Sequence, residues 1–111
     1  MKRNIDPPPG VTEQEMRRLE DDHIICFIDK KTMTRPMQSP DGKFYNYTTL
    51  VDYLSDHKGL GPLGQLIDMK DVVLREDLIF DIYAFVEQNP THPCIRENII
   101  SDWKRLGLIP E

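Results

Sequence analysis

Prolines and glycines cut this 111-residue chain into short segments, and their spacing limits what it can fold into. Turn or loop signals stand at residues 40–42 (Pro-Asp-Gly), 59–64 and 89–90 (Asn-Pro). Proline lacks a backbone donor and glycine adopts turn conformations, so helices and strands are expected to end at these places. With 39% hydrophobic residues, the chain can bury one compact core. We therefore expect a single small domain with short elements.

Hydrophobic spacing between these breaks predicts a small α+β domain. Thr12 and Glu15 match a capping box, which predicts a helix that carries Met16 and Leu19 on one side. Asn46 is expected to cap a second helix. The expected order begins with an extended lead-in (1–11), a short helix (12–20), a β-hairpin (37–45) and a central helix (46–55). A loop (59–64), a short strand (72–74) and a further helix (78–86) follow.

The C-terminal part of the chain predicts one more helix. Thr91 is expected to cap it, Pro93 to lie in its first turn and Gly107 to end it. Its apolar face would consist of residues at helical spacing, namely Ile95, Ile99, Trp103 and Leu106. These expectations divide the chain into a lead-in with a short helix at 1–23, a folded domain at 24–89 and an additional helix at 90–111.

Charge and composition narrow the classes of partner. The net charge is −5 and the pI is near 5.1, which argues against nucleic acid because phosphate binding depends on Lys and Arg. No apolar run approaches the roughly 20 residues of a membrane helix, so this segment is expected to make no membrane contact. Cys26 and Cys94 stand far apart. One disulfide between them stays possible, but their number favours a reducing, cytoplasmic compartment.

The residues that carry chemistry are sparse. Two zinc ions in a RING finger need about eight Cys and His ligands in close pairs, whereas this chain has two Cys and three His. His92 stands beside Cys94, but Pro93 between them need not aim the imidazole at the thiol. The glycines of residues 59–64 match a dinucleotide motif, but a helix rather than a strand is expected before them. The sequence therefore predicts no metal, no cofactor and no catalytic residue on this chain.

A set of positions from residue 26 to residue 62 has the residue types and spacing of one family. These positions are Cys26, Ile28, Met33, Pro36, Gly42, Tyr45, Asn46, Leu50, Leu54 and Pro62. They resemble the U-box, a RING-like fold that holds two loops by hydrogen bonds and packing instead of zinc. The resemblance covers about residues 24–86, and the helix with Phe85 fits with one deletion.

The U-box resemblance implies a ubiquitin ligase that binds a ubiquitin-charged conjugating enzyme and promotes ubiquitin transfer to a lysine of a protein substrate. Such a ligase forms no covalent intermediate and acts by orienting the thioester. By resemblance, the conjugating enzyme would contact Ile28 on loop one, Pro62 on loop two, Tyr53 and Leu50 on the helix between, and Lys30. Gln65 would stand where many RING-like ligases place a cation that clamps ubiquitin.

Several positions depart from the family pattern. Gln65 brings no charge to the clamp position, Lys30 stands where an aromatic residue is common, and Phe27 replaces the usual proline. With these departures and the flanking helices, the chain resembles the U-box effectors that intracellular bacterial pathogens inject into the host cytosol. This resemblance implies a role in virulence and a chain that is part of a longer protein. Two alternatives remain: a non-catalytic adaptor of the same fold and a winged-helix-like DNA-binding protein.

Overall fold

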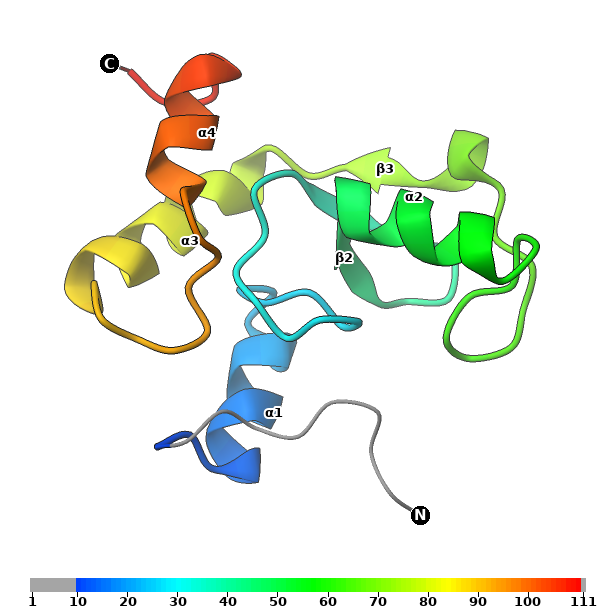
Figure 1. Ribbon diagram of the computed structural model, residues 1–111, viewed down its shortest axis with the longest axis horizontal. Coiled ribbons are helices and arrows are strands. Elements are labelled where there is room, and N and C mark those ends of the chain that lie inside the picture. Colours follow the sequence, from blue (N-terminus) through cyan, green and yellow to red (C-terminus); the bar gives the residue numbers. More distant parts are fainter. Residues whose placement is uncertain (1–9, 111) are drawn as a thin grey trace.

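A computed structural model describes residues 10–110 of the chain, and Figure 1 shows the arrangement of its elements. The elements are α1 (Glu13–Asp21), β1 (Pro36–Gln38), β2 (Phe44–Asn46), α2 (Tyr47–Asp56), a 3-10 turn η1 (Met69–Asp71), β3 (Val73–Leu74), α3 (Asp77–Gln88) and α4 (Ile99–Arg105). The predicted small α+β class is therefore confirmed. No helix within residues 10–110 has the length and apolar character needed to cross a membrane.

The predicted hairpin supplies two strands of a three-stranded antiparallel sheet with the order β2-β1-β3, in which β1 is the central strand. Met37 of β1 lies opposite Tyr45 of β2 on one side and Leu74 of β3 on the other. Gly42 turns the hairpin with a φ of +85°, a conformation that residues with a Cβ rarely adopt. The buried Tyr45 hydroxyl donates to Asp41 Oδ2 at 2.6 Å, which ties the turn to the strand.

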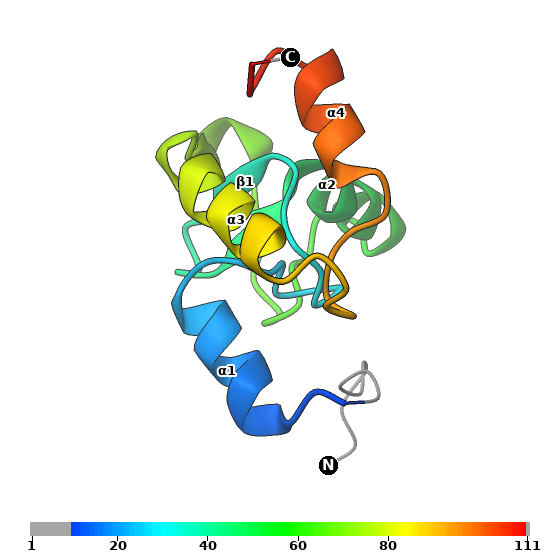
Figure 2. The same cartoon turned by 90° about the vertical axis from the view of Figure 1, so that its left-hand side faces the viewer.

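Helix α1 begins as the sequence predicted. The backbone N–H of Glu15 donates to Thr12 Oγ1 at 3.0 Å, as in a capping box. Met16 and Leu19 are buried from the same face of the helix. Figures 1 and 2 place α1 and α4 at opposite ends of the molecule, with the sheet, α2 and α3 between them.

Helix α2 starts where predicted, but Asn46 does not cap it with its side chain. Asn46 Oδ1 instead accepts from the backbone N–H of Thr34 at 2.8 Å and of Arg35 at 3.2 Å. Its Nδ2 donates to the hydroxyls of Thr48 and Thr49. The buried amide therefore joins the segment before β1 to the first turn of α2, and capping by Asn46 is corrected to this bridging role.

The C-terminal helix is shorter than predicted because it begins at Ile99. Thr91 does not cap it, and Asn98, with a φ of 63°, precedes it. The backbone of the preceding segment bonds elsewhere: Thr32 N donates to Cys94 O at 2.8 Å, and Arg96 N donates to Thr32 Oγ1 at 2.8 Å. These bonds replace the first helical turns that the sequence predicted.

The C-terminal segment packs into the same hydrophobic core as the sheet and the other helices. Cys94, Ile99 and Trp103 are all buried in this core, together with residues of α1, α2 and α3. Trp103 Nε1 donates to Thr34 O at 2.8 Å. Leu106 remains 41% exposed, so the predicted apolar face of this helix is only partly covered.

Candidate functional site

Residues 25–32 form a closed loop, here called loop one. An isolated antiparallel bridge between Ile25 and Thr32 closes it, and Cys26 N donates to Lys31 O at 2.8 Å inside it. Phe27 N donates to Phe44 O at 3.0 Å, which attaches the loop to β2. Backbone hydrogen bonds therefore close loop one and attach it to β2.

Asp29 anchors the tip of loop one from two directions. Thr49 Oγ1, in the first turn of α2, donates to Asp29 Oδ2 at 3.1 Å. Arg96 NH2 lies 2.8 Å from Asp29 Oδ2 and 3.0 Å from Asp29 Oδ1. The same guanidinium donates through Nε to Thr32 O at 2.9 Å. One arginine from the segment before α4 thus binds both the tip and the end of loop one.

Residues 59–67 form a second closed loop, here called loop two, at the C-terminal end of α2. Gly59 N donates to Leu54 O of α2 at 2.8 Å, and Leu60 and Leu66 form an isolated antiparallel bridge. Gly61 N donates to Gln65 O at 2.8 Å. In Figure 1 this loop lies at the end of α2 that is farther from α3 and α4. Loop two is therefore a compact loop closed by its own backbone.

One face of α2 connects the two loops. Thr49, which holds loop one, and Tyr53 are four residues apart and therefore lie on the same side of the helix. Tyr53 stacks on His57 at a ring-centroid distance of 3.8 Å, and His57 stands just before loop two. The face from Thr49 through Tyr53 to His57 is thus bordered by loop one at its start and by loop two at its end.

Four of the six predicted contact residues present surface to solvent. Ile28 on loop one, Tyr53 on α2 and Pro62 on loop two are partly exposed, and Gln65 is exposed. The other two are corrected. Leu50 has no exposed surface because it packs in the core, so it supports α2 from beneath. Lys30 is also buried, and its ammonium is bound within the protein.

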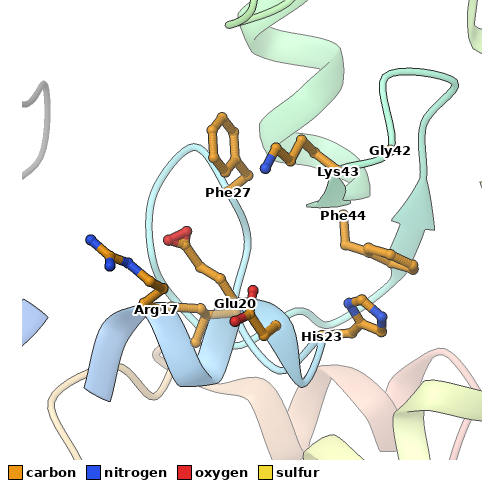
Figure 3. Close-up of a pocket in the computed structure, with 9 residues that line it drawn as sticks. Arg17, Glu20, His23, Phe27, Gly42, Lys43 and Phe44 are labelled. Carbon is orange, nitrogen blue, oxygen red and sulfur yellow. The ribbon is translucent and has the colours of Figure 1, made fainter. Parts of the chain in front are cut away.

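The Lys30 side chain closes a contact between loop one and α1. Its Nζ donates to Glu20 Oε2 at 3.0 Å and lies 4.2 Å from the centroid of the Phe27 ring. Glu20 and Phe27 also line a cavity of about 410 Å³ between α1 and the hairpin. Figure 3 shows the Lys43 side chain directed toward the Phe27 ring, from whose centroid its Nζ lies 4.9 Å, while Arg17 points away from them. Lys30 therefore fixes loop one against α1 and leaves no charge free for a partner.

Three leucines of loop two, which the sequence analysis did not select, form its most exposed apolar surface. Leu60 is 43% exposed, Leu63 53% and Leu66 76%. Leucines at intervals of three residues in a glycine-rich loop were visible in the sequence. A loop this short cannot fold over its own leucines and bury them. The leucine spacing could therefore have identified these residues as exposed. They lie on either side of Pro62 and Gln65, which extends the apolar part of the site along loop two.

The two cysteines have the chemistry of buried core residues. Both are free thiols with no exposed surface. Burial, and to a smaller extent the charge of Asp29, raises the pKa of Cys26 to about 11. Burial and Glu15 also raise the pKa of Cys94. The Cys94 backbone N–H, rather than its thiol, donates to His92 Nδ1 at 3.1 Å, so His92 is not arranged to activate the thiol.

No family model and no curated protein sequence matches the chain. Among residues 10–110, no group of three or more His, Cys, Asp or Glu side chains could hold a metal ion. The candidate functional site is therefore the pair of closed loops, which one face of α2 joins. Partly exposed aliphatic and aromatic side chains at these three places can form a small protein-binding surface.

Proposed function

We propose that this chain is a ubiquitin ligase domain of the U-box type, which binds a ubiquitin-charged conjugating enzyme and promotes transfer of ubiquitin to a substrate lysine. The observation that carries the proposal is the pair of closed loops at the two ends of α2, each with a partly exposed aliphatic residue, Ile28 and Pro62. The residue pattern from Cys26 to Pro62 and the α+β architecture both support it.

The way in which the loops are closed supports the same proposal. RING domains hold two such loops with zinc, whereas hydrogen bonds and two partly buried ion pairs, Arg96–Asp29 and Lys30–Glu20, hold them here. A chain with few Cys and His residues and this loop geometry suits a metal-free version of the RING fold. Tyr53, on the α2 face between the loops, would complete the surface that the conjugating enzyme contacts.

The proposed activity requires no bond chemistry on this chain. The domain would hold the thioester between enzyme and ubiquitin in a reactive orientation, which lowers the entropic cost of attack by the lysine. A surface of a few aliphatic anchors fits a small and transient complex. Because Lys30 is occupied by Glu20, the anchors expected to matter are Ile28, Tyr53 and Pro62, together with the leucines of loop two.

An in vitro ubiquitination assay with a panel of conjugating enzymes tests the proposal directly. Ile28→Ala and Pro62→Ala are each expected to reduce ubiquitin transfer about tenfold. This corresponds to a loss of about 1.4 kcal/mol of binding free energy for one anchor side chain. Phe80→Ala is the matched control, because Phe80 is a 70% exposed apolar residue on α3. Undiminished transfer by the Ile28/Pro62 double variant would rule out this surface as the docking site.

A non-catalytic adaptor is the second candidate, and Gln65 is the observation that favours it. Gln65 is exposed on loop two and brings no positive charge to the position where a cation would clamp ubiquitin. Titration of the domain with isotope-labelled conjugating enzymes separates the two candidates. Resonance shifts combined with ubiquitin transfer support the ligase. Resonance shifts without transfer, or no shifts with any enzyme of the panel, support the adaptor.

A further inference from the structure

A second cavity, of about 250 Å³, opens between the N-terminal end of α2 and α4. In Figure 1 this end of α2 is the one that faces α3 and α4. Arg35, Arg96 and Arg105 line the cavity, and Asp102 is the single carboxylate among the lining residues. Three positive charges against one negative charge give the lining an excess of two positive charges, although the whole chain has a net charge of −5.

Arg35 is the cation of this cavity that is free to bind a ligand. Arg96 is engaged by Asp29 at 2.8 Å and Arg105 by Asp102 at 3.1 Å. Within the described part of the chain, no carboxylate pairs with Arg35. Its guanidinium instead lies 4.6 Å from the centroid of the Tyr47 ring, which fixes its position. A planar guanidinium held in this way can give two parallel hydrogen bonds to an oxyanion.

The first turn of α2 adds a second source of positive potential. The helix is ten residues long and has neither an acidic residue in its first turn nor a side-chain cap. The N–H groups of Thr48 and Thr49 stand at positions that have no intrahelical acceptor. Such amides and the helix dipole favour a negative charge beside them. Tyr47 and Thr48 both line the cavity, so this end of the helix faces it.

Thr34 supplies an independent indication of a ligand. Thr34 is only 8% exposed and lines the cavity, and its Oγ1 is buried without a hydrogen-bond partner among the described residues. A buried hydroxyl without a partner costs free energy, so such groups in folded proteins are nearly always satisfied. A hydroxyl that donates to an anion in the cavity would remove this cost.

We propose that this cavity binds a phosphate monoester, or phosphate itself, through Arg35, the Thr34 hydroxyl and the first amides of α2. A phosphate group offers three oxygens in different directions, which matches donors from a side chain, a hydroxyl and a helix end better than the two oxygens of a carboxylate do. Leu106 and Tyr47 also line the cavity and provide apolar contact for the organic part of a monoester. This site adjoins the anchor of loop one, because Arg96 also lines the cavity, but the proposal does not depend on the proposed docking function.

The larger cavity beside α1 does not carry an equivalent proposal. Its lining has Arg17 and Lys43 against Glu20 and Asp21, so its formal charge is balanced. Glu20 is already bound to Lys30 at 3.0 Å. Its lining therefore favours no ligand of a particular charge.

Titration of the isotope-labelled chain with inorganic phosphate and with O-phosphoserine, at constant ionic strength, tests the proposal. We expect saturable shifts of the Thr34, Thr48 and Thr49 amides, with no shifts on titration with serine. Arg35→Gln is expected to weaken binding about tenfold through loss of a charge-assisted contact. Arg17→Gln, which removes an exposed arginine of α1, is the matched control and should leave the affinity unchanged.

The outcomes separate the sources of the phosphate group. Tighter binding of O-phosphoserine than of inorganic phosphate assigns the site to phosphorylated side chains, and equal binding assigns it to free phosphate. Shifts that do not saturate, or an equal loss of affinity in Arg35→Gln and Arg17→Gln, would overturn the proposal. Thr34→Val provides a second variant that removes only the hydroxyl, and thermal unfolding of each variant confirms that it remains folded.

Discussion

The two loops at the ends of α2 are stabilised in different ways. Loop one is bound by side chains that are distant in sequence, since Arg96 contacts residues 64 and 67 positions away. Loop two is closed by bonds within itself and to the adjacent end of α2, such as Gly61 N to Gln65 O and Gly59 N to Leu54 O. Loop one buries charged groups, whereas loop two has no charged residue and exposes leucines.

This difference suggests a division of roles between a positioned loop and an exposed one. Loop one presents one partly exposed aliphatic residue, Ile28, beside the anchored Asp29. Loop two presents a wider apolar surface on a short, locally closed backbone. Damage to loop one should therefore change the stability of the whole domain, while damage to loop two should change mainly what the domain binds. Four substitutions or conditions test this difference.

Arg96→Ala should have the largest effect, because it removes the bonds to Asp29 and to Thr32 O together. Loss of one partner from a partly buried ion pair leaves the other charge without compensation. We expect the free energy of unfolding to fall by about 3 kcal/mol, measured by urea denaturation. Arg18→Ala is the control: Arg18 forms an exposed pair with Glu15 at 3.7 Å, and its loss should change stability by less than about 0.5 kcal/mol. Similar losses in both variants would contradict the anchoring role of Arg96.

Alkaline pH should weaken the region of loop one before that of loop two. Burial raises the pKa of Cys26 from 9.0 to about 11, so the folded protein favours the neutral thiol. The resulting stabilisation is complete below about pH 9 and is lost as the pH rises toward 11. It amounts to about 3 kcal/mol for a shift of this size. Loop two has no titratable side chain.

Urea denaturation between pH 8 and pH 11 measures this loss. Burial also raises the pKa values of Cys94 and Tyr45, which adds to the decline with the same sign. Cys26→Ala removes one titrating group and should therefore flatten the pH dependence relative to the unsubstituted chain. An unchanged slope in Cys26→Ala would show that Cys26 does not contribute.

The same contrast explains what the sequence could and could not predict. Local signals were sufficient for α1, the hairpin and α3: the Thr12 hydroxyl caps α1 at the Glu15 N–H, and Gly42 turns the hairpin. Contacts between distant segments were not visible. The predicted early start of the last helix was wrong because Thr32 takes the Cys94 carbonyl and the Arg96 amide. Lys30 was predicted to contact a partner, but it is buried and paired with Glu20, and the sequence did not indicate this pairing.

Gly61→Ala should have a smaller effect that stays within loop two. A Cβ at this position would lie 3.2 Å from Ile67 Cγ1 and too close to its terminal methyl group. Because the end of an isoleucine side chain can shift, we expect a loss of about 1 kcal/mol in stability. Ile67→Val removes that methyl group, so the Gly61→Ala/Ile67→Val double variant should lose less than the sum of the single variants. Additive losses would indicate that the strain arises elsewhere.

Leu66→Ser should have the smallest effect on stability and should act on binding alone, unlike Arg96→Ala, which acts on stability. Leu66 is 76% exposed, so its substitution should change the free energy of unfolding by less than about 0.5 kcal/mol. If loop two supplies the apolar surface for a partner, Leu66→Ser should weaken binding of a conjugating enzyme in the panel titration. Phe80→Ser on α3 should not. Equal weakening by both variants would mean that general surface hydrophobicity drives binding. Loss of binding by Leu66→Ser alone, at unchanged stability, would separate contact at loop two from positioning at loop one.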